Sequence, residues 1–320
     1  MKLLLPLLLI LCVPLMGDEK EDKEFFEKTK ALAAPRAAVA RNRAPEVKAV
    51  PGEIRERFKL KGGFYAKYVD AEGIPILSSA TVNDAALLEA RYVVLNMLRG
   101  REDLLKNMRT RRIRLSVMAW NEFNTEMPEF KNLPRWWDRR SRGISGVKAT
   151  TCGEENLLNY RGDPFSGGSI LVHEFTHVFQ HSGMSVLDRT FSARVRAAYN
   201  KAKASGQFRG YAMTKQSEFF AVGAQSWFHA NGKMDFIRVR DGKKTPLNTR
   251  AKITEHLPDL AKLLRETFGD NPWRYTPTYQ RSNQEHLKNF NRRKAPRFFW
   301  PKDVLAAWNK ELARRRAKSK

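Results

Sequence analysis

The sequence is short of cysteine, of long apolar runs and of acidic residues, and each shortage excludes a class of protein. Only 2 of its 320 residues are cysteines. Cys12 lies in an apolar N-terminal segment, so Cys152 would stand alone after processing, and a fold held by internal disulfides is excluded. The apolar run at residues 3–16 is too short to span a bilayer comfortably as a helix.

The N-terminus instead has the pattern of a secretory signal. Lys2 supplies a short positive region, residues 3–16 supply the apolar region, and Gly17 suits a nearby cleavage. We therefore predict a signal peptide at residues 1–17 and a secreted or extracytoplasmic protein of the periplasm or cell envelope. An uncleaved anchor is the alternative. Lipidation of Cys12 is not expected, because the residue before it is not small.

The shortage of acids leaves a strongly basic chain. Lys and Arg number 59 against 34 Asp and Glu, a formal net charge of +25. This charge predicts attraction to anionic partners such as envelope lipids, cell-wall polymers, nucleic acid or acidic substrates, and it says nothing about the fold. A basic surface that is merely solvated is the alternative interpretation.

The 42% of apolar residues can bury a substantial core. Helical and alternating patterns together predict an α+β domain that is mostly helical with a small mixed sheet. A strand is expected at residues 112–117. Helices are expected from a start at Thr81–Asp84 to just before Gly100, from Phe191 to a stop at Gly206, and at 258–268 with a stop at Gly269. The predicted segments that follow the signal peptide are a charged Ala/Pro-rich linker at 18–56, the domain at 57–280, and a basic C-terminal helix and tail at 281–320.

Residues 121–147 have no regular period and predict a long covering loop. Trp136 and Trp137 within it alternate with arginines, which suits a local hydrophobic plug better than a polyanion site. The next run, at 151–158, predicts a strand beside a cleft. An exposed edge there would hold an extended peptide by main-chain hydrogen bonds.

The chemistry is concentrated in an apolar helix that begins after Ser169. His173 and His177 are four residues apart, so both imidazoles lie on one face and can bind one metal ion. Glu174 sits beside that ion and can take a proton from water that zinc has acidified. This is the H-E-x-x-H arrangement of metallopeptidases. Ser169 suits the N-cap, and Ser182-Gly183 predicts the end of the helix.

A catalytic zinc ion usually takes three protein ligands, so one more is required. His181 lies one turn beyond His177, but three ligands on one straight helix do not easily converge on a tetrahedral ion. Glu218 is the better candidate, on a downstream helix that Thr214 can cap. One zinc ion per chain is expected, and no nucleotide cofactor.

Tyr211-Ala followed by Glu218-Phe-Phe-Ala, downstream of His-Glu-Phe-x-His, resembles the gluzincin peptidases of the anthrax lethal factor-like family. Mlc titration factor-like peptidases share the Glu-Phe-Phe-Ala-Val pattern. The resemblance implies a zincin-like fold, with zinc held by His173, His177 and Glu218. It also implies Glu174 as general base, Tyr211 as a hydrogen-bond donor to the oxyanion, and a peptide or protein substrate.

One position departs from that family. An acid commonly stands four residues after the ligand Glu and supports a zinc histidine, whereas this chain has Val222. Loss of such a partner typically weakens metal binding or activity tenfold to a hundredfold. Either another group replaces it or the site is weaker. We therefore predict a secreted zinc metallopeptidase, with a non-catalytic, zinc-containing basic protein that binds an anionic envelope polymer as the alternative.

Overall fold

The computed structural model describes residues 45–146, 148–232 and 235–318, which belong to one folded unit, Pro45–Lys320. The predicted signal peptide at 1–17 and most of the predicted linker lie outside the described residues. In the described part of the chain, no helix combines the length and the apolar character needed to cross a membrane.

The unit contains two sheets. The larger has the strand order β1-β2-β3-β4-β5; β1 to β3 pair antiparallel, and β3, β4 and β5 pair parallel. The smaller is the antiparallel order β6-β7-β8. Their strands are β1 Lys48–Ala49, β2 Lys67–Ala71, β3 Ile74–Ser78, β4 Arg114–Met118, β5 Ala149–Gly153, β6 Phe208–Arg209, β7 Ile237–Arg240 and β8 Lys243–Pro246. This mixed architecture confirms the predicted α+β class.

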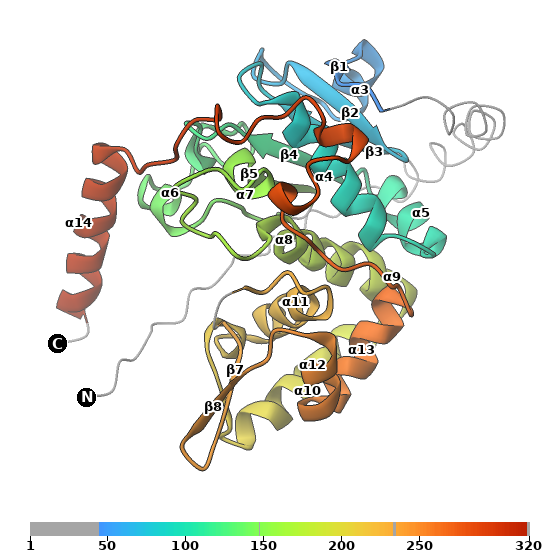
Figure 1. The fold of residues 1–320 in the computed structure, drawn as a ribbon, viewed down its shortest axis with the longest axis vertical. Coiled ribbons are helices and arrows are strands. Elements are labelled where there is room, and N and C mark those ends of the chain that lie inside the picture. Colours follow the sequence, from blue (N-terminus) through green and yellow to red (C-terminus); the bar gives the residue numbers. More distant parts are fainter. Residues whose placement is uncertain (1–44, 147, 233–234, 319–320) are drawn as a thin grey trace. The chain divides into compact units, whose positions relative to one another are not determined.

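Helices make up most of the regular structure of the unit. They are α3 Gly52–Arg57, α4 Asp84–Met97, α5 Glu102–Thr110, α6 Trp136–Arg140, α7 Glu154–Leu157, α8 Ile170–Val178, α9 Ser185–Leu187, α10 Phe191–Ala204, α11 Gln216–Trp227, α12 Arg250–His256, α13 Pro258–Phe268 and α14 Lys302–Lys318. Figure 1 shows α8 between the five-stranded sheet and the group formed by α10 to α13. Helix α8 packs on β5 and on α11, so it is central to the core.

Local signals placed several elements well. Asn83 caps α4 by accepting a hydrogen bond from the Ala85 amide at 2.9 Å, and α13 spans the predicted residues and ends at Gly269, whose φ is +62°. In contrast, the helix that begins after Ser169 does not stop at Ser182-Gly183. It passes into a π-helical turn, Phe179–Met184, whose buried side chains pack in the core. Thr214 is not the cap of α11, because Lys215 occupies that position.

The folded unit begins earlier than predicted. Strand β1 pairs with β2, and Val50 and Ile54 are buried against Tyr65 and Tyr68, so residues 45–56 are not a linker. The predicted boundary at residue 280 also has no counterpart. Arg281 donates to the buried carboxylate of Glu89 on α4, which ties the C-terminal region to the core.

The loop at 121–147 is mostly irregular and carries the short helix α6, on which α14 packs. The ring centroids of Trp136 and Trp308 lie 6.4 Å apart, and the Arg315 guanidinium lies 4.9 Å from the Trp136 ring centroid. Trp136, which stacks on Trp137, thus packs against α14, and both tryptophans are half-buried, in agreement with the predicted hydrophobic plug. On α14, Val304 and Glu311 are buried and Trp308 is half-buried, whereas Leu305 is 38% exposed.

Candidate metal centre

Helix α8 presents its two motif histidines toward α11. The Ser169 hydroxyl accepts a hydrogen bond from the Val172 amide at 3.3 Å, as expected of an N-cap. Leu171, Val172, Phe175 and Val178 are buried and hold the helix in place. The side chains of His173 and His177 are 12% and 13% exposed, and their ring centroids lie 5.0 Å apart.

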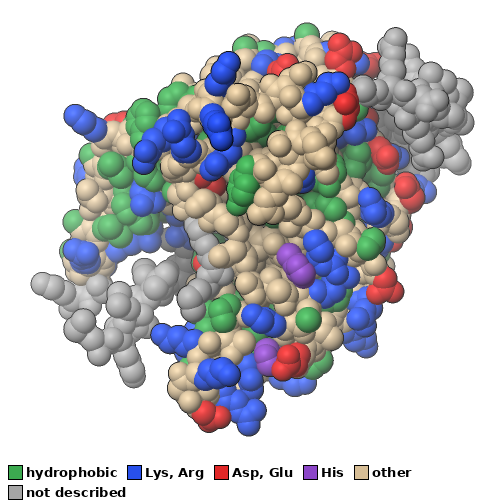
Figure 2. All heavy atoms as spheres, viewed as in Figure 1, with side chains coloured by type: hydrophobic (Ala, Val, Ile, Leu, Met, Phe, Trp, Pro, Cys, Tyr) green, Lys and Arg blue, Asp and Glu red, His purple; other side chains and the backbone are tan. Residues whose placement is uncertain are grey.

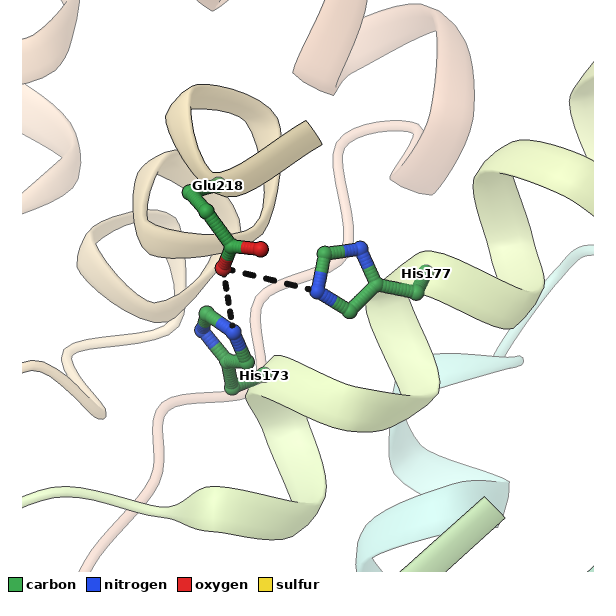
Figure 3. Close-up of side chains that lie close together, drawn as sticks. All are labelled: His173, His177 and Glu218. Atoms are coloured by element: carbon green, nitrogen blue, oxygen red, sulfur yellow. Dashed lines mark ion pairs between the residues drawn. The ribbon is translucent and has the colours of Figure 1, made fainter. Parts of the chain in front are cut away.

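Helix α11 brings Glu218 to the same point from the other side (Figure 3). Its Oε2 atom lies 3.0 Å from His173 Nε2 and 3.6 Å from His177 Nε2. One ligand atom from each residue falls within 4.8 Å of the other two. Four residues beyond His177, His181 is exposed and does not belong to this cluster. The structure thus brings together the predicted set His173, His177 and Glu218.

The cluster fits a metal ion chemically. Glu218 Oε2 is buried and faces the two imidazoles, but neither contact has the geometry of a hydrogen bond, a costly state for a carboxylate oxygen. Two imidazoles and one carboxylate are the donors that zinc prefers, and a set of three leaves one position for water or substrate. The other oxygen, Oε1, lies 3.3 Å from Lys215 Nζ, which offsets part of its charge.

The charges at the cluster shift the pKa values of its members strongly. Burial by itself would lower the pKa of His173, but the Glu218 and Glu174 carboxylates outweigh it and raise that pKa to about 9. Burial would likewise raise the pKa of Glu218, yet His173 and His177 hold it well below its usual range. The protein has therefore assembled a site in which the carboxylate is ionised and needs positive charge nearby.

Gln225 orients one of the histidines. Its Oε1 lies 3.1 Å from His173 Nδ1, and its Nε2 donates to the Ser169 carbonyl oxygen at 3.1 Å. Because the amide oxygen can only accept, Nδ1 carries a proton, so when the imidazole is neutral it is Nε2, on the side of Glu218, that is free to bind a metal ion. Val222, where the resemblance leads one to expect an acid, is buried in the core, and the histidine contact comes from Gln225 instead.

Sequence reasoning did not single out Gln225 as a site residue, although a signal was present. Glu218 and Gln225 are seven residues apart, which is close to two helical turns and places both side chains on one face of α11. Only the packing of α11 on α8 decides which histidine that face meets.

Tyr211 lies beside the cluster. Its ring centroid is 6.0 Å from that of His173, and the residue is 41% exposed. Burial of its hydroxyl end, together with the negative charges of Glu218 and Glu174, raises the pKa of Tyr211 above its usual range. The hydroxyl therefore keeps its proton near neutral pH and can act as a hydrogen-bond donor.

Glu174 is approached by the chain segment 142–146, which lies along the outer edge of β5. The Thr151 amide donates to the Ile144 carbonyl oxygen at 2.9 Å, so β5 is not the exposed edge that the sequence predicts. Gly143 permits the close approach, because a Cβ there would lie 2.8 Å from the Thr151 carbonyl oxygen and 3.0 Å from Glu174 Cγ. Cys152 is fully buried and lies outside the metal cluster.

Comparison with known proteins adds no assignment: no family model, no curated protein and no solved structure matches the chain.

Proposed function

We propose that the chain is a zinc-dependent peptidase of the gluzincin type with a zincin-like fold. The observation that carries the proposal is the meeting of His173, His177 and Glu218 from two helices, with one buried Glu218 oxygen left without a hydrogen-bond partner. Zinc bound there would act as a Lewis acid on a peptide carbonyl and lower the pKa of an attacking water.

The chain's own residues supply the remaining chemistry. Glu174 lies on α8 close enough for its negative charge to act on both His173 and Tyr211, so its carboxylate can take the proton of the attacking water and pass it to the leaving amide nitrogen. Tyr211 donates a hydrogen bond to the oxygen of the scissile carbonyl as negative charge develops there. Gln225 holds His173 in the tautomer that binds metal through Nε2.

An extended peptide substrate would lie along the segment 142–146. This segment, rather than β5, forms the outer edge of the sheet, and it runs next to Glu174. Arg142 anchors this segment in the core. Its side chain is fully buried, and its Nε atom lies 2.6 Å from Glu155 Oε1. A substrate positioned by main-chain hydrogen bonds to that edge would pass over the metal cluster.

The test is a digest of a proteome-derived peptide library with the wild-type protein and with Glu174→Gln, both loaded with zinc. We expect cleavage by the wild type only, because the amide cannot accept the proton of the attacking water. His181→Ala is the matched control: it removes a neighbouring imidazole and should leave zinc content and cleavage unchanged.

Two outcomes would contradict the proposal. Equal cleavage by wild type and Glu174→Gln would point to a contaminating peptidase or another base. Full zinc content without any cleavage by the wild type would favour the alternative, a non-catalytic zinc protein of the cell envelope.

A further inference from the structure

A second cluster of charged side chains lies at the far end of α11, away from the metal cluster. Arg250 Nη2 and Arg274 Nη1 both donate to one acceptor, the Asn271 carbonyl oxygen, at 2.8 and 3.2 Å. Two guanidinium groups are therefore held within a few ångströms of each other. In the described residues, neither is hydrogen-bonded to a carboxylate.

The packing fixes both arginines. Thr249 caps α12 by accepting a hydrogen bond from the Lys252 amide at 3.3 Å, which places Arg250 at the first helical position. The Arg250 guanidinium lies 4.1 Å from the Trp227 ring centroid. Arg274 Nη1 also donates to the Trp273 carbonyl oxygen at 2.7 Å. The pair is thus preorganised rather than mobile in solvent.

Negative charge near the pair is sparse and exposed. Asp270 is the acid whose charge acts on Arg250, but its side chain is 91% exposed and lies 3.5 Å from Arg265 instead. Glu255 is 70% exposed and lies beside His256. Burial, and then the charge of Arg274, lower the pKa of Arg250 to about 10, as expected for a cation whose charge is poorly compensated.

The two arginines line an open pocket of about 630 Å³ together with His229, Ala251, Thr254 and Glu255. His229 adopts the left-handed backbone conformation, with φ +58°, at the end of α11. Burial, then the charges of Arg274 and Arg250, lower the pKa of His229. Figure 2 shows many Lys and Arg side chains and few acidic ones over the region of β8 and α12.

Three cationic or potentially cationic groups thus converge on one hollow, and the guanidinium nitrogens Arg250 Nη1 and Arg274 Nη2 have no hydrogen-bond partner among the described residues. Guanidinium groups recognise phosphate and sulfate through paired N–H donors. The pocket is wide open to solvent, so an oxyanion bound between the guanidinium groups leaves room beside it for the rest of a larger molecule.

We propose that the Arg250–Arg274–His229 pocket binds the phosphate or sulfate group of a larger anionic molecule, such as a phosphorylated sugar. The oxyanion lies between the two guanidinium groups, and the rest of the ligand occupies the remaining space near Thr254. This site is independent of the metal centre, so its assignment does not depend on peptidase activity.

The test uses the zinc-free full-length protein, so that phosphate cannot bind through the metal. The His229 imidazole resonances are followed by NMR while inorganic phosphate, and separately glucose 6-phosphate, is added at physiological ionic strength. We expect saturable binding and an increase in the pKa of His229, because a dianion nearby stabilises imidazolium. Glucose 6-phosphate should bind more tightly than the free ion, because the pocket is larger than one phosphate.

Arg274→Gln and Arg265→Gln form a matched pair of variants, since each removes one positive charge but only Arg274 lines the pocket. Loss of a charge-assisted hydrogen bond should weaken binding by about tenfold or more in Arg274→Gln. Arg265→Gln should bind as the wild type does. Arg274 is the better choice than Arg250, whose stacking on Trp227 also supports the fold.

Three outcomes would overturn the proposal. The first is the absence of saturable phosphate binding. The second is an equal loss in both variants, which would reveal diffuse attraction to a basic surface. The third is binding of inorganic phosphate at least as tightly as glucose 6-phosphate, which would rule out a larger ligand. His229→Asn, which tolerates the left-handed backbone, should bind phosphate with reduced affinity and keep the fold.

Discussion

The two ends of α11 differ in the sign of the charge that lies beside them. Glu218, in the first turn, is a buried carboxylate with one oxygen that lacks a hydrogen bond, and two imidazoles face it. At the last turn, Trp227 supports Arg250, and a second guanidinium shares the same carbonyl acceptor. Helix α11 has 12 residues and is therefore about 18 Å long, so the two sites are separate.

The dipole of α11 favours this distribution of charge. A carboxylate is favoured at the positive N-terminal end and a guanidinium at the negative C-terminal end, each by about 0.3–1 kcal/mol. That contribution is too small to compensate a buried ionised carboxylate or two adjacent cations. The opposite charges at the two ends agree with the two proposals, a cation site at Glu218 and an anion site at Arg250 and Arg274.

The sharpest way to break this comparison is to remove the carboxylate. Glu218→Ala should lose zinc altogether, because two imidazoles on one helix do not complete a site of three protein ligands. Metal analysis after dialysis measures the outcome. Glu255→Ala, an exposed acid at the other end of α11, should retain a full zinc content. Zinc retained by Glu218→Ala would move the third ligand elsewhere, with His181 the first residue to examine.

Tyr211 separates transition-state stabilisation from metal binding. Tyr211→Phe should keep its zinc and its thermal stability while peptide turnover falls by about a hundredfold, the scale expected when one oxyanion donor is lost. Tyr279→Phe, which also removes an exposed phenol, is the control and should turn over normally. Unchanged kinetics in Tyr211→Phe would exclude this residue from the mechanism.

Gln225 tests whether an amide does the work of the missing acid. Gln225→Ala should weaken zinc affinity by about tenfold to a hundredfold, because His173 loses the partner that fixes its tautomer. Gln225→Glu should restore most of the affinity. Competition with a zinc chelator gives the two constants, and Gln216→Ala, near the start of the same helix, serves as control. Equal affinities throughout would mean that His173 needs no orientation.

The smallest expected effect is a pH dependence of the zinc-free protein. The folded-state pKa of His173 is about 9, above its ordinary value of 6.5. Its contribution to stability is therefore fully present below pH 6.5 and is lost as the pH rises through about 9. Glu218 acts at the other limit, because its pKa is lowered: its contribution is present above its ordinary pKa of 4.5 and declines in acid.

Thermal unfolding from pH 6 to 10 measures this effect. The melting temperature of the zinc-free protein should fall across that range by more than that of zinc-free Glu218→Gln, in which the ion pair is absent. Zinc-loaded protein should not show the same decline, since metal-binding imidazoles are already unprotonated. A parallel decline in wild type and Glu218→Gln would remove His173 as the cause.

Prediction from the sequence succeeded where a feature depends on residues close together in the chain. The Ser169 cap and the Gly269 stop are local hydrogen-bonding and backbone preferences, and both appear in the structure. Prediction failed where a segment with the composition of a linker is buried by contacts with distant residues. Residues 45–56 look like a charged linker, yet Val50 and Ile54 find apolar partners contributed by residues further along the chain.

The spacing of His173 and His177 could be interpreted from the sequence alone, because residues four apart lie on one face of any α-helix. Only the tertiary structure decided the rest of both sites. The packing of α11 on α8 sets Glu218 beside the imidazoles and Gln225 beside His173, and the packing of α12 near Asn271 brings Arg250 to Arg274. Those contacts join residues more than twenty positions apart, and no local pattern specifies such a distance.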